Sequence, residues 1–220
     1  MADELRALEA EIAGYRAWAD ASGLPIERQS GEWASLYPDW QRLYTAFDNF
    51  VAASSWPAWN EATAALLIYA IARDDENTHL IKSLARKRED FLHLAEYAVT
   101  SSERDARWQF AAELVRLDAD RPRVETLLLR YAHDDEEYVR RIALMSLADI
   151  GAPNLEELAV SIWNTAEASD IESEYKRMAV LYTLNKIGSP QLDAYLALAA
   201  AEGPQHLAEY AVRIRNGDPE

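Results

Sequence analysis

Cysteine is absent from this chain of 220 residues, and its absence excludes disulfides, thiolate metal sites and cysteine nucleophiles. Glycine is scarce, with seven residues, and no two of them stand close enough for a phosphate-binding P-loop or a dinucleotide fingerprint. No apolar run approaches the roughly 20 residues that a membrane-spanning helix requires. The first residues are acidic and do not form a signal-peptide pattern. These absences predict a cytoplasmic protein.

Basic residues are also few. The 22 Lys and Arg residues stand against 38 Asp and Glu, which gives a formal net charge of −16. Nucleic acid and anionic lipid both require a basic surface, so neither is an expected partner. A basic protein is the natural electrostatic counterpart. Half of the residues are apolar, enough for a buried core, and the composition leaves the oligomeric state open.

Strand-like alternation of apolar and polar residues is missing too. Apolar residues recur instead at spacings of three and four, as on one face of an amphipathic helix. Prolines stand where helices begin, and Gly151 and Gly188 stand where a left-handed glycine would end one. Residues 22–37 are expected to form a loop. The predicted helices cover 3–20, a segment after Pro38, 57–72, 76–87, 88–100, 103–117, 121–132, 135–150, 153–165, 171–187, 190–201 and 204–215.

Two segments that end in Ile-Gly are related by a shift of 37 residues. Residues 137–151 align with residues 174–188, and seven of the fifteen positions are identical. A weaker copy lies 33 residues earlier, where Ala106-Arg107 corresponds to Val139-Arg140. Internal periods of this length are typical of helical repeat arrays, in which each helix pair buries its apolar faces against the next pair.

This repeat resembles the HEAT-like helical repeats, especially the short bacterial kind. The acidic turn at 134–137, the Val139-Arg140 pair and the final Ile150-Gly151 match the family pattern. Lys176 stands where the family has valine. The resemblance implies an all-α fold, a right-handed α-α superhelix in the form of a HEAT-like solenoid of about five helix pairs.

The resemblance also implies a role for the arginine that follows the valine. In the family this arginine typically reaches the acidic turn of a neighbouring repeat. Arg107, Arg140 and Arg177 occupy the corresponding places, and we interpret them as scaffold residues.

Residues 1–56 carry no repeat signal, but five of the seven tryptophans lie before residue 60. We interpret 1–56 as an N-terminal aromatic-rich helical cap. It would cover the exposed end of a HEAT-like array at 57–220, with both packed as one domain. The alternative is an aromatic contact patch, because Trp and Tyr dominate binding hot spots. Trp33 and Tyr37, in the expected loop, are its best candidates.

Acidic residues gather at the turns before the second helices of the repeats. Equivalent turns align along one edge of a right-handed stack, so these residues predict an acidic edge. Helix capping and solubility explain about one acidic residue per turn. Only the acidic residues beyond that number indicate a basic partner. The tyrosines start or flank second helices, which line the concave face in such solenoids. The candidate protein-binding residues are Asp74, Asp75, Glu76, Asp134, Asp135, Glu136, Glu137, Tyr138, Glu172, Glu174, Tyr175 and Tyr182.

Signatures of catalysis are missing. The four histidines, at positions 79, 93, 133 and 206, are isolated and lack the spacing of a zinc-binding helix. No serine stands in a Gly-x-Ser-x-Gly elbow, and no pair of carboxylates is distinguished from the many others. We therefore predict no catalytic, cofactor-binding or metal-binding residues.

Charge and repeat class together predict a non-enzymatic protein-binding module. A small, acidic HEAT-like binder resembles bacterial immunity proteins, which neutralise a toxin domain, often a basic nuclease. Two alternatives stay open: a HEAT-like enzyme or cofactor-holding protein similar to the bilin lyases, and a scaffold subunit of a larger complex. The HEAT-like alkylpurine DNA glycosylases bind DNA on a basic face, which a net charge of −16 disfavours.

Overall fold

The computed structural model describes residues 2–23, 31–117, 120–165 and 171–217, and these residues form helices with no strand among them. The predicted all-α class is therefore confirmed. The chain divides into two compact units, residues 1–119 and residues 120–220. Each unit is described by itself. The expected cap at 1–56 packs within unit 1 together with the helices that follow it, and its role as a cap stays a prediction.

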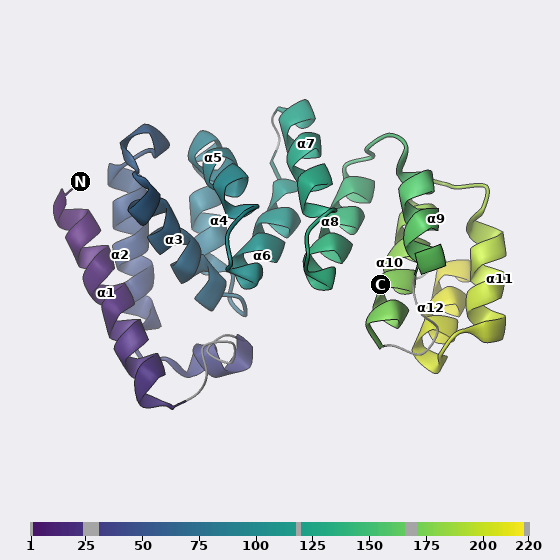
Figure 1. Ribbon diagram of the computed structural model, residues 1–220, viewed down its shortest axis with the longest axis horizontal. Helices are drawn as coiled ribbons and strands as arrows, with labels where there is room; N and C mark the ends of the chain where they lie inside the picture. The colour runs from purple at the N-terminus through teal and green to yellow at the C-terminus, as the bar shows by residue number, and fades with distance from the viewer. Residues whose placement is uncertain (1, 24–30, 118–119, 166–170, 218–220) are drawn as a thin grey trace. The chain divides into compact units, whose positions relative to one another are not determined.

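Unit 1 is built from helix pairs whose second helices pack side by side (Figure 1). The second helices α2, α4 and α6 contact one another in that order, and α3 packs broadly on α6. The elements are α1 (Ala2–Ala21), η2 (Gly31–Leu36), α2 (Trp40–Ala53), η3 (Trp56–Ala58), α3 (Glu61–Arg73), α4 (His79–Ala85), α5 (Arg88–Ala98) and α6 (Arg104–Leu114).

Unit 2 is also built from helix pairs. The second helices α8, α10 and α12 pack laterally, while α7, α9 and α11 each pack on their partner. Leu144, Val180, Leu184 and Leu207 are fully buried where these helices meet, each burial contributing about 1.5–3 kcal/mol of hydrophobic free energy. The elements are α7 (Arg121–Tyr131), α8 (Glu137–Asp149), α9 (Leu155–Thr165), α10 (Ile171–Lys186), α11 (Leu192–Glu202) and α12 (Gln205–Arg215).

The ends of the second helices confirm the predicted glycine caps. Gly151 and Gly188 adopt φ angles of 61° and 65°, the left-handed region that glycine enters without steric cost. The following residue closes the same bond in both repeats: the Ala152 N–H donates to the Leu147 carbonyl, and the Ser189 N–H donates to the Leu184 carbonyl. Both repeats therefore end in a Schellman motif.

Two helix starts and one loop differ from expectation. The helix expected at 76–87 is α4, which covers only His79–Ala85. Pro57 lies in η3, and α3 begins only at Glu61 because the Asn60 side chain accepts a hydrogen bond from the Thr63 N–H at 2.8 Å. The Asn60 side chain accepts from a free N–H group of the first helical turn and so fixes the helix start. Proline only lacks a backbone N–H and makes no such bond. Within the expected loop at 22–37, residues 31–36 form the short 3-10 helix η2, and 24–30 lie outside the described residues.

Side-chain contacts between neighbouring helix pairs recur at similar sequence separations. In unit 2, Tyr182 bonds Asp149, Ser189 bonds Glu156 and the Leu207 N–H bonds Glu174, and every one of these pairs is 33 residues apart. In unit 1, contacts between neighbouring helix pairs span 30 to 44 residues. The separation in unit 2 matches the 33-residue spacing of the sequence alignment.

Within the part of the chain that the structure describes, no helix combines the length and the apolar character needed to cross a membrane.

Candidate functional site

Asp74, the first residue of the predicted acidic edge, is an interior residue. Its side chain is 1% exposed. One carboxylate oxygen accepts a hydrogen bond from the Tyr44 hydroxyl and the other accepts from the Leu80 N–H, both at 2.7 Å. Burial raises the pKa of Asp74, although both bonds oppose the shift. Because a buried carboxylate does not reach a partner, Asp74 belongs to the scaffold of the α3–α4 turn.

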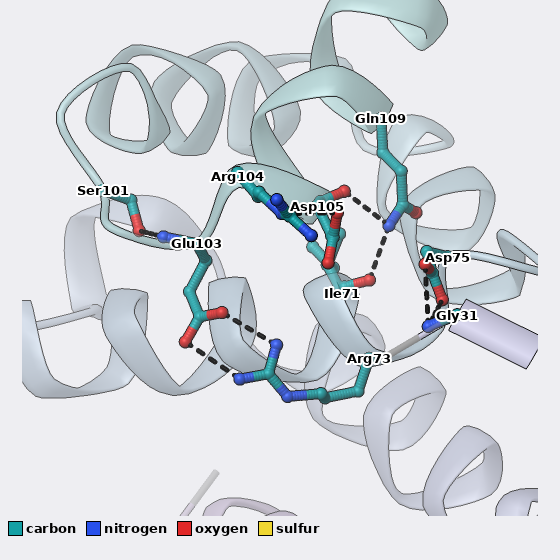
Figure 2. A network of polar contacts seen from close by, with 9 residues as sticks. All are labelled: Gly31, Ile71, Arg73, Asp75, Ser101, Glu103, Arg104, Asp105 and Gln109. Atoms are coloured by element: carbon teal, nitrogen blue, oxygen red, sulfur yellow. Dashed lines mark hydrogen bonds and ion pairs between the residues drawn. The ribbon is translucent and has the colours of Figure 1, made fainter. Parts of the chain in front are cut away.

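Asp75 is half-buried and holds the start of η2. Both of its oxygens accept from the Gly31 N–H at 3.1 Å (Figure 2). Burial, together with the nearby charge of Asp105, raises the pKa of Asp75 to about 6. Glu76, the next residue, is exposed. Of the three acids at this turn, Glu76 alone presents its carboxylate fully at the surface.

The raised pKa of Asp75 predicts a pH-dependent stability. Between its ordinary value of 3.8 and about 6, the folded chain holds a proton that the unfolded chain has released. The free energy of unfolding therefore falls as the pH rises through this interval. Asp75→Asn keeps an acceptor for Gly31 without the charge. We expect it to raise the unfolding free energy at pH 7.5 by about 1 kcal/mol after solvent screening.

The matched control is Glu76→Gln, which removes the same charge from the exposed neighbour and is expected to change stability by less than about 0.5 kcal/mol. Urea unfolding of the three proteins at pH 4 and pH 7.5 provides the comparison. An Asp75→Asn advantage that persists at pH 4, or that Glu76→Gln reproduces, would contradict the assignment to Asp75.

A polar network fixes α3 against the start of α6 (Figure 2). The Arg73 guanidinium, 6% exposed, donates to both Glu103 oxygens at 2.8 and 3.3 Å. The Gln109 amide donates to the carbonyls of Ile71 at 2.7 Å and Asp105 at 2.9 Å. A bidentate pair at low exposure is geometrically specific, so these residues position helices and do not form a contact surface.

Beside this network an open cleft of about 830 Å³ lies between α1, α3 and the α5–α6 turn. Tyr69 contributes to its lining, and the Arg16 guanidinium lies over the Tyr69 ring, 4.3 Å from the ring centre. Glu9, Glu61 and Glu103 contribute carboxylates to its lining. The cleft gives unit 1 a predominantly acidic recess.

The α7–α8 turn places its two aspartates before the helix without a capping role. Neither Asp134 nor Asp135 caps α8, whose N-cap is Glu136 without a side-chain cap bond. Asp134 instead accepts from the Glu136 N–H at 2.9 Å, one residue before the helix. Its carboxylate closes the turn, while Asp135 is exposed and Glu136 is half-buried.

The repeat arginines contact their own turns and the neighbouring helix. Arg140 donates to the backbone carbonyl of Asp134 at 2.6 Å, and Arg107 donates to that of Ser101 at 2.5 Å. In each case the acceptor lies six residues earlier, in the turn of the same repeat. Arg177, the third of the set, stacks its guanidinium over the Trp163 ring at 5.2 Å. These contacts favour the scaffold interpretation, and for Arg107 and Arg140 they include a carbonyl of the residue's own turn.

Tyr138 and Tyr175 lie on the neighbouring helices α8 and α10, and each keeps more than two fifths of its surface exposed, at 43% and 44%. The Arg141 guanidinium lies 4.9 Å from the centre of both rings. Its Nε also pairs with Glu137 at 3.2 Å. We call Glu137, Tyr138, Arg141 and Tyr175 the tyrosine surface.

Electrostatics around the tyrosine surface are mixed. Burial raises the pKa of Glu137, against the lowering effect of Arg141 and Lys176, and the charge of Glu172 on α10 raises it further. Glu172 is exposed. The charges at the starts of α8 and α10 therefore influence each other within unit 2.

Two remaining candidates make internal contacts. Glu174 is 9% exposed and accepts from the Leu207 N–H at 3.0 Å, which ties α10 to the start of α12. The Tyr182 hydroxyl donates to Asp149, and Lys186 pairs with the same carboxylate at 2.9 Å. A recess of about 510 Å³ is lined by Glu174, Tyr175 and residues of α12. It extends the tyrosine surface from α10 toward α12.

Sequence reasoning missed Arg141. In the repeat alignment it stands opposite Met178, so comparison of the copies did not select it. Helical spacing contained the signal, because Arg141 follows Glu137 by four residues and Tyr138 by three, the separations at which side chains meet on one helix face.

The N-terminal aromatic residues pack mainly against one another. Trp33 stacks on Trp18 with ring centres 4.3 Å apart, and Tyr37 meets Trp40 edge-on at 5.9 Å. Tyr37 and Trp40 are buried, and Trp18 and Trp33 are partly so. This packing favours the cap interpretation over a contact patch.

One cluster in the described residues brings a serine, a histidine and an aspartate together without the contact that activates a serine. Ser83 and His79 both contact Asp48, but the serine hydroxyl donates to the carboxylate, not to the imidazole base that would activate it. No group of three or more His, Asp or Glu side chains in the described ranges is placed to hold a metal ion. Comparisons with protein-family models, curated proteins and solved structures gave no match.

Proposed function

We propose that this chain is a non-enzymatic protein-binding module of the HEAT-like class. Its helix pairs would form a right-handed array, and it would act in the cytoplasm as an acidic inhibitor of the immunity type. The partner is a basic protein, such as a toxin or nuclease domain. The tyrosine surface on α8 and α10 is the observation that carries this proposal.

The tyrosine surface has the composition of a binding hot spot. Tyr and Arg are enriched where protein interfaces contribute most of their free energy. Arg141 lies between Tyr138 and Tyr175 and is held by Glu137, so both rings are oriented before a partner arrives. Preorganised side chains lose less conformational entropy on binding.

Charge supports a basic partner. Asp135 and Glu172 are exposed beside the tyrosine surface, and the chain as a whole carries a net charge of −16. Long-range attraction would accelerate encounter with a cationic protein and would weaken as salt is added. Asp74 and Glu174 are excluded from this surface because their carboxylates serve internal hydrogen bonds.

Support for the HEAT-like class comes from each unit separately. The second helices pack laterally in both units, and cross-repeat contacts in unit 2 recur at 33 to 37 residues. Identical Schellman motifs end α8 and α10. Each of these features is expected when one helical pair is repeated along a chain.

A crosslinking experiment tests the proposal. A photoactivatable phenylalanine replaces Tyr175 in one protein and Leu198, an equally exposed residue of α11, in the control. Both are illuminated in extracts of the source cells at low salt, and crosslinked proteins are identified by mass spectrometry. We expect a basic protein captured from position 175 only. That protein is then purified, and its affinity is measured between 50 and 500 mM salt.

Affinity should fall steeply across this salt range. An acidic partner, equal capture from position 198, or salt-independent binding would each contradict the proposal.

A further inference from the structure

A pocket of about 120 Å³ opens beside the tyrosine surface, between α8, α9 and α10 of unit 2. Its apolar lining comes from Leu144, Ile162 and Ala179. Leu144 and Ala179 are buried at 1% and 4% exposure, so the interior of the pocket is hydrocarbon. For comparison, an apolar cavity of about 150 Å³ accommodates one benzene ring.

The polar lining of this pocket is cationic. Arg140, Arg141 and Lys176 contribute three positive charges against one negative charge from Glu137. This excess is unusual in a chain with 22 basic and 38 acidic residues. Arg140 donates to the neutral carbonyls of Asp134 and Asp135, so those bonds orient its charge without cancelling it.

We propose that this pocket binds a carboxylate carried on a short apolar stem. The stem occupies the space lined by Leu144, Ile162 and Ala179, and the carboxylate meets Lys176 and the two arginines. The chemistry is shared by a free aromatic or aliphatic acid and by the C-terminus of a peptide that ends in an apolar residue. The proposal does not rest on the proposed function, because it concerns the purified chain alone.

The shape and the charge of the pocket each exclude a simpler ligand. A neutral hydrocarbon would leave the excess positive charge without a counterion. Inorganic phosphate would place a fully hydrated anion against buried aliphatic side chains, and desolvating it there costs free energy. A ligand with one apolar end and one anionic end satisfies both parts of the lining.

Benzoate is the probe, and the methyl resonances of Leu144, Ile162 and Ala179 in the purified chain are the readout. We expect saturable shifts of these methyl groups with millimolar affinity. Benzyl alcohol, a neutral molecule of similar size, should bind about tenfold more weakly because it lacks the charge-assisted contacts. Phosphate should leave the three methyl groups unshifted.

Lys176→Gln removes one of the pocket's cations, and Lys186→Gln on the same helix is its matched control. Lys186 pairs with Asp149 and does not line the pocket. We expect the first substitution to weaken benzoate binding about fivefold, the size of one partly screened ion contact, and the second to change it by less than about 1.5-fold. Both side chains reach solvent, so the thermal unfolding of both variants should match that of the original chain.

A second titration separates the two sources of the carboxylate. N-acetyl-Ala-Leu with a free C-terminus is compared with benzoate and with its own amide. Tighter binding of the peptide acid assigns the pocket to a peptide C-terminus, and tighter binding of benzoate assigns it to a free acid. Equal binding of benzoate and benzyl alcohol, methyl shifts caused by phosphate, or equal loss in the two lysine variants overturns the proposal.

Discussion

Asp74→Ala is expected to lower the free energy of unfolding by about 3 kcal/mol. The substitution leaves two donors without their acceptor, the Tyr44 hydroxyl and the Leu80 N–H. Leu80 is fully buried, so water does not replace the lost bond to its backbone. An unsatisfied buried donor costs about 1–3 kcal/mol, and two such donors account for the expected loss.

Asp74 also restrains an unusual backbone. Thr78 adopts a φ angle of 53°, a left-handed conformation that β-branched residues rarely take. Its N–H donates to the Asp74 carbonyl at 2.7 Å, and the Asp74 side chain holds Leu80 two residues later. Loss of the carboxylate therefore removes one of the contacts that keep the α3–α4 turn in a strained form.

A graded series distinguishes this account from a general loss of charge. Tyr44→Phe removes one of the two bonds and keeps the ring that stacks on Trp40 and His79, so about 1 kcal/mol is expected. Asp74→Asn retains one acceptor oxygen and should fall between Tyr44→Phe and Asp74→Ala. Glu76→Ala, the exposed control two residues away, should cost less than about 0.5 kcal/mol. Urea unfolding followed by circular dichroism ranks the variants, and a Glu76→Ala loss equal to that of Asp74→Ala would reject the account.

Local physics explains which parts of the fold were predictable. Helical periodicity and the glycines at 151 and 188 act within a few residues, and the structure has helices and left-handed caps where they predicted them. The start of α3 was wrong by four residues because Asn60, not Pro57, satisfies the first helix donors. The prediction used only the position of Pro57 and did not consider that Asn60, three residues later, caps the helix.

The candidate site was less predictable because charge and spacing do not reveal burial. Asp74 and Glu76 are both acids of one turn, yet the first is interior and the second is exposed. The difference is set by Tyr44, 30 residues away in the sequence. Likewise, Glu174 aligns with Glu137 in the repeat, but its contact with Leu207 depends on the helix pair that follows. The net charge of −16 therefore overstates the acidic contact surface.

Arg141 illustrates a further limit. Its significance depends on two rings that approach it from different helices, Tyr138 at three residues and Tyr175 at 34 residues in the sequence. Periodicity identifies the first neighbour but not the second. The tyrosine surface is thus a tertiary feature, although both of its tyrosines were selected from the repeat.

Tyr175→Ala is expected to weaken binding of the partner captured by crosslinking by about 2 kcal/mol, close to 30-fold. The substitution removes an exposed ring and one of the two surfaces on which the Arg141 guanidinium lies. Leu198→Ala on α11, which truncates a side chain of similar exposure, should leave the affinity within about twofold. Fold stability should fall by a similar amount in both variants because the two residues are about equally exposed, at 44% and 42%.

Binding kinetics distinguish the contribution of the tyrosines from that of the surrounding acidic residues. Loss of Tyr175 should act mainly on the dissociation rate, because short-range packing forms after encounter. Asp135→Asn combined with Glu172→Gln should act mainly on the association rate and should reduce its salt dependence. Surface plasmon resonance at several salt concentrations measures both rates.

Combining Tyr138→Ala with Tyr175→Ala tests whether the two rings act together through Arg141. Because Tyr138 and Tyr175 both contact Arg141, the double variant should lose less affinity than the two single losses combined. Additive losses would show that the two rings act independently, and the proposed preorganisation by Arg141 would then be wrong even if both tyrosines contact the partner.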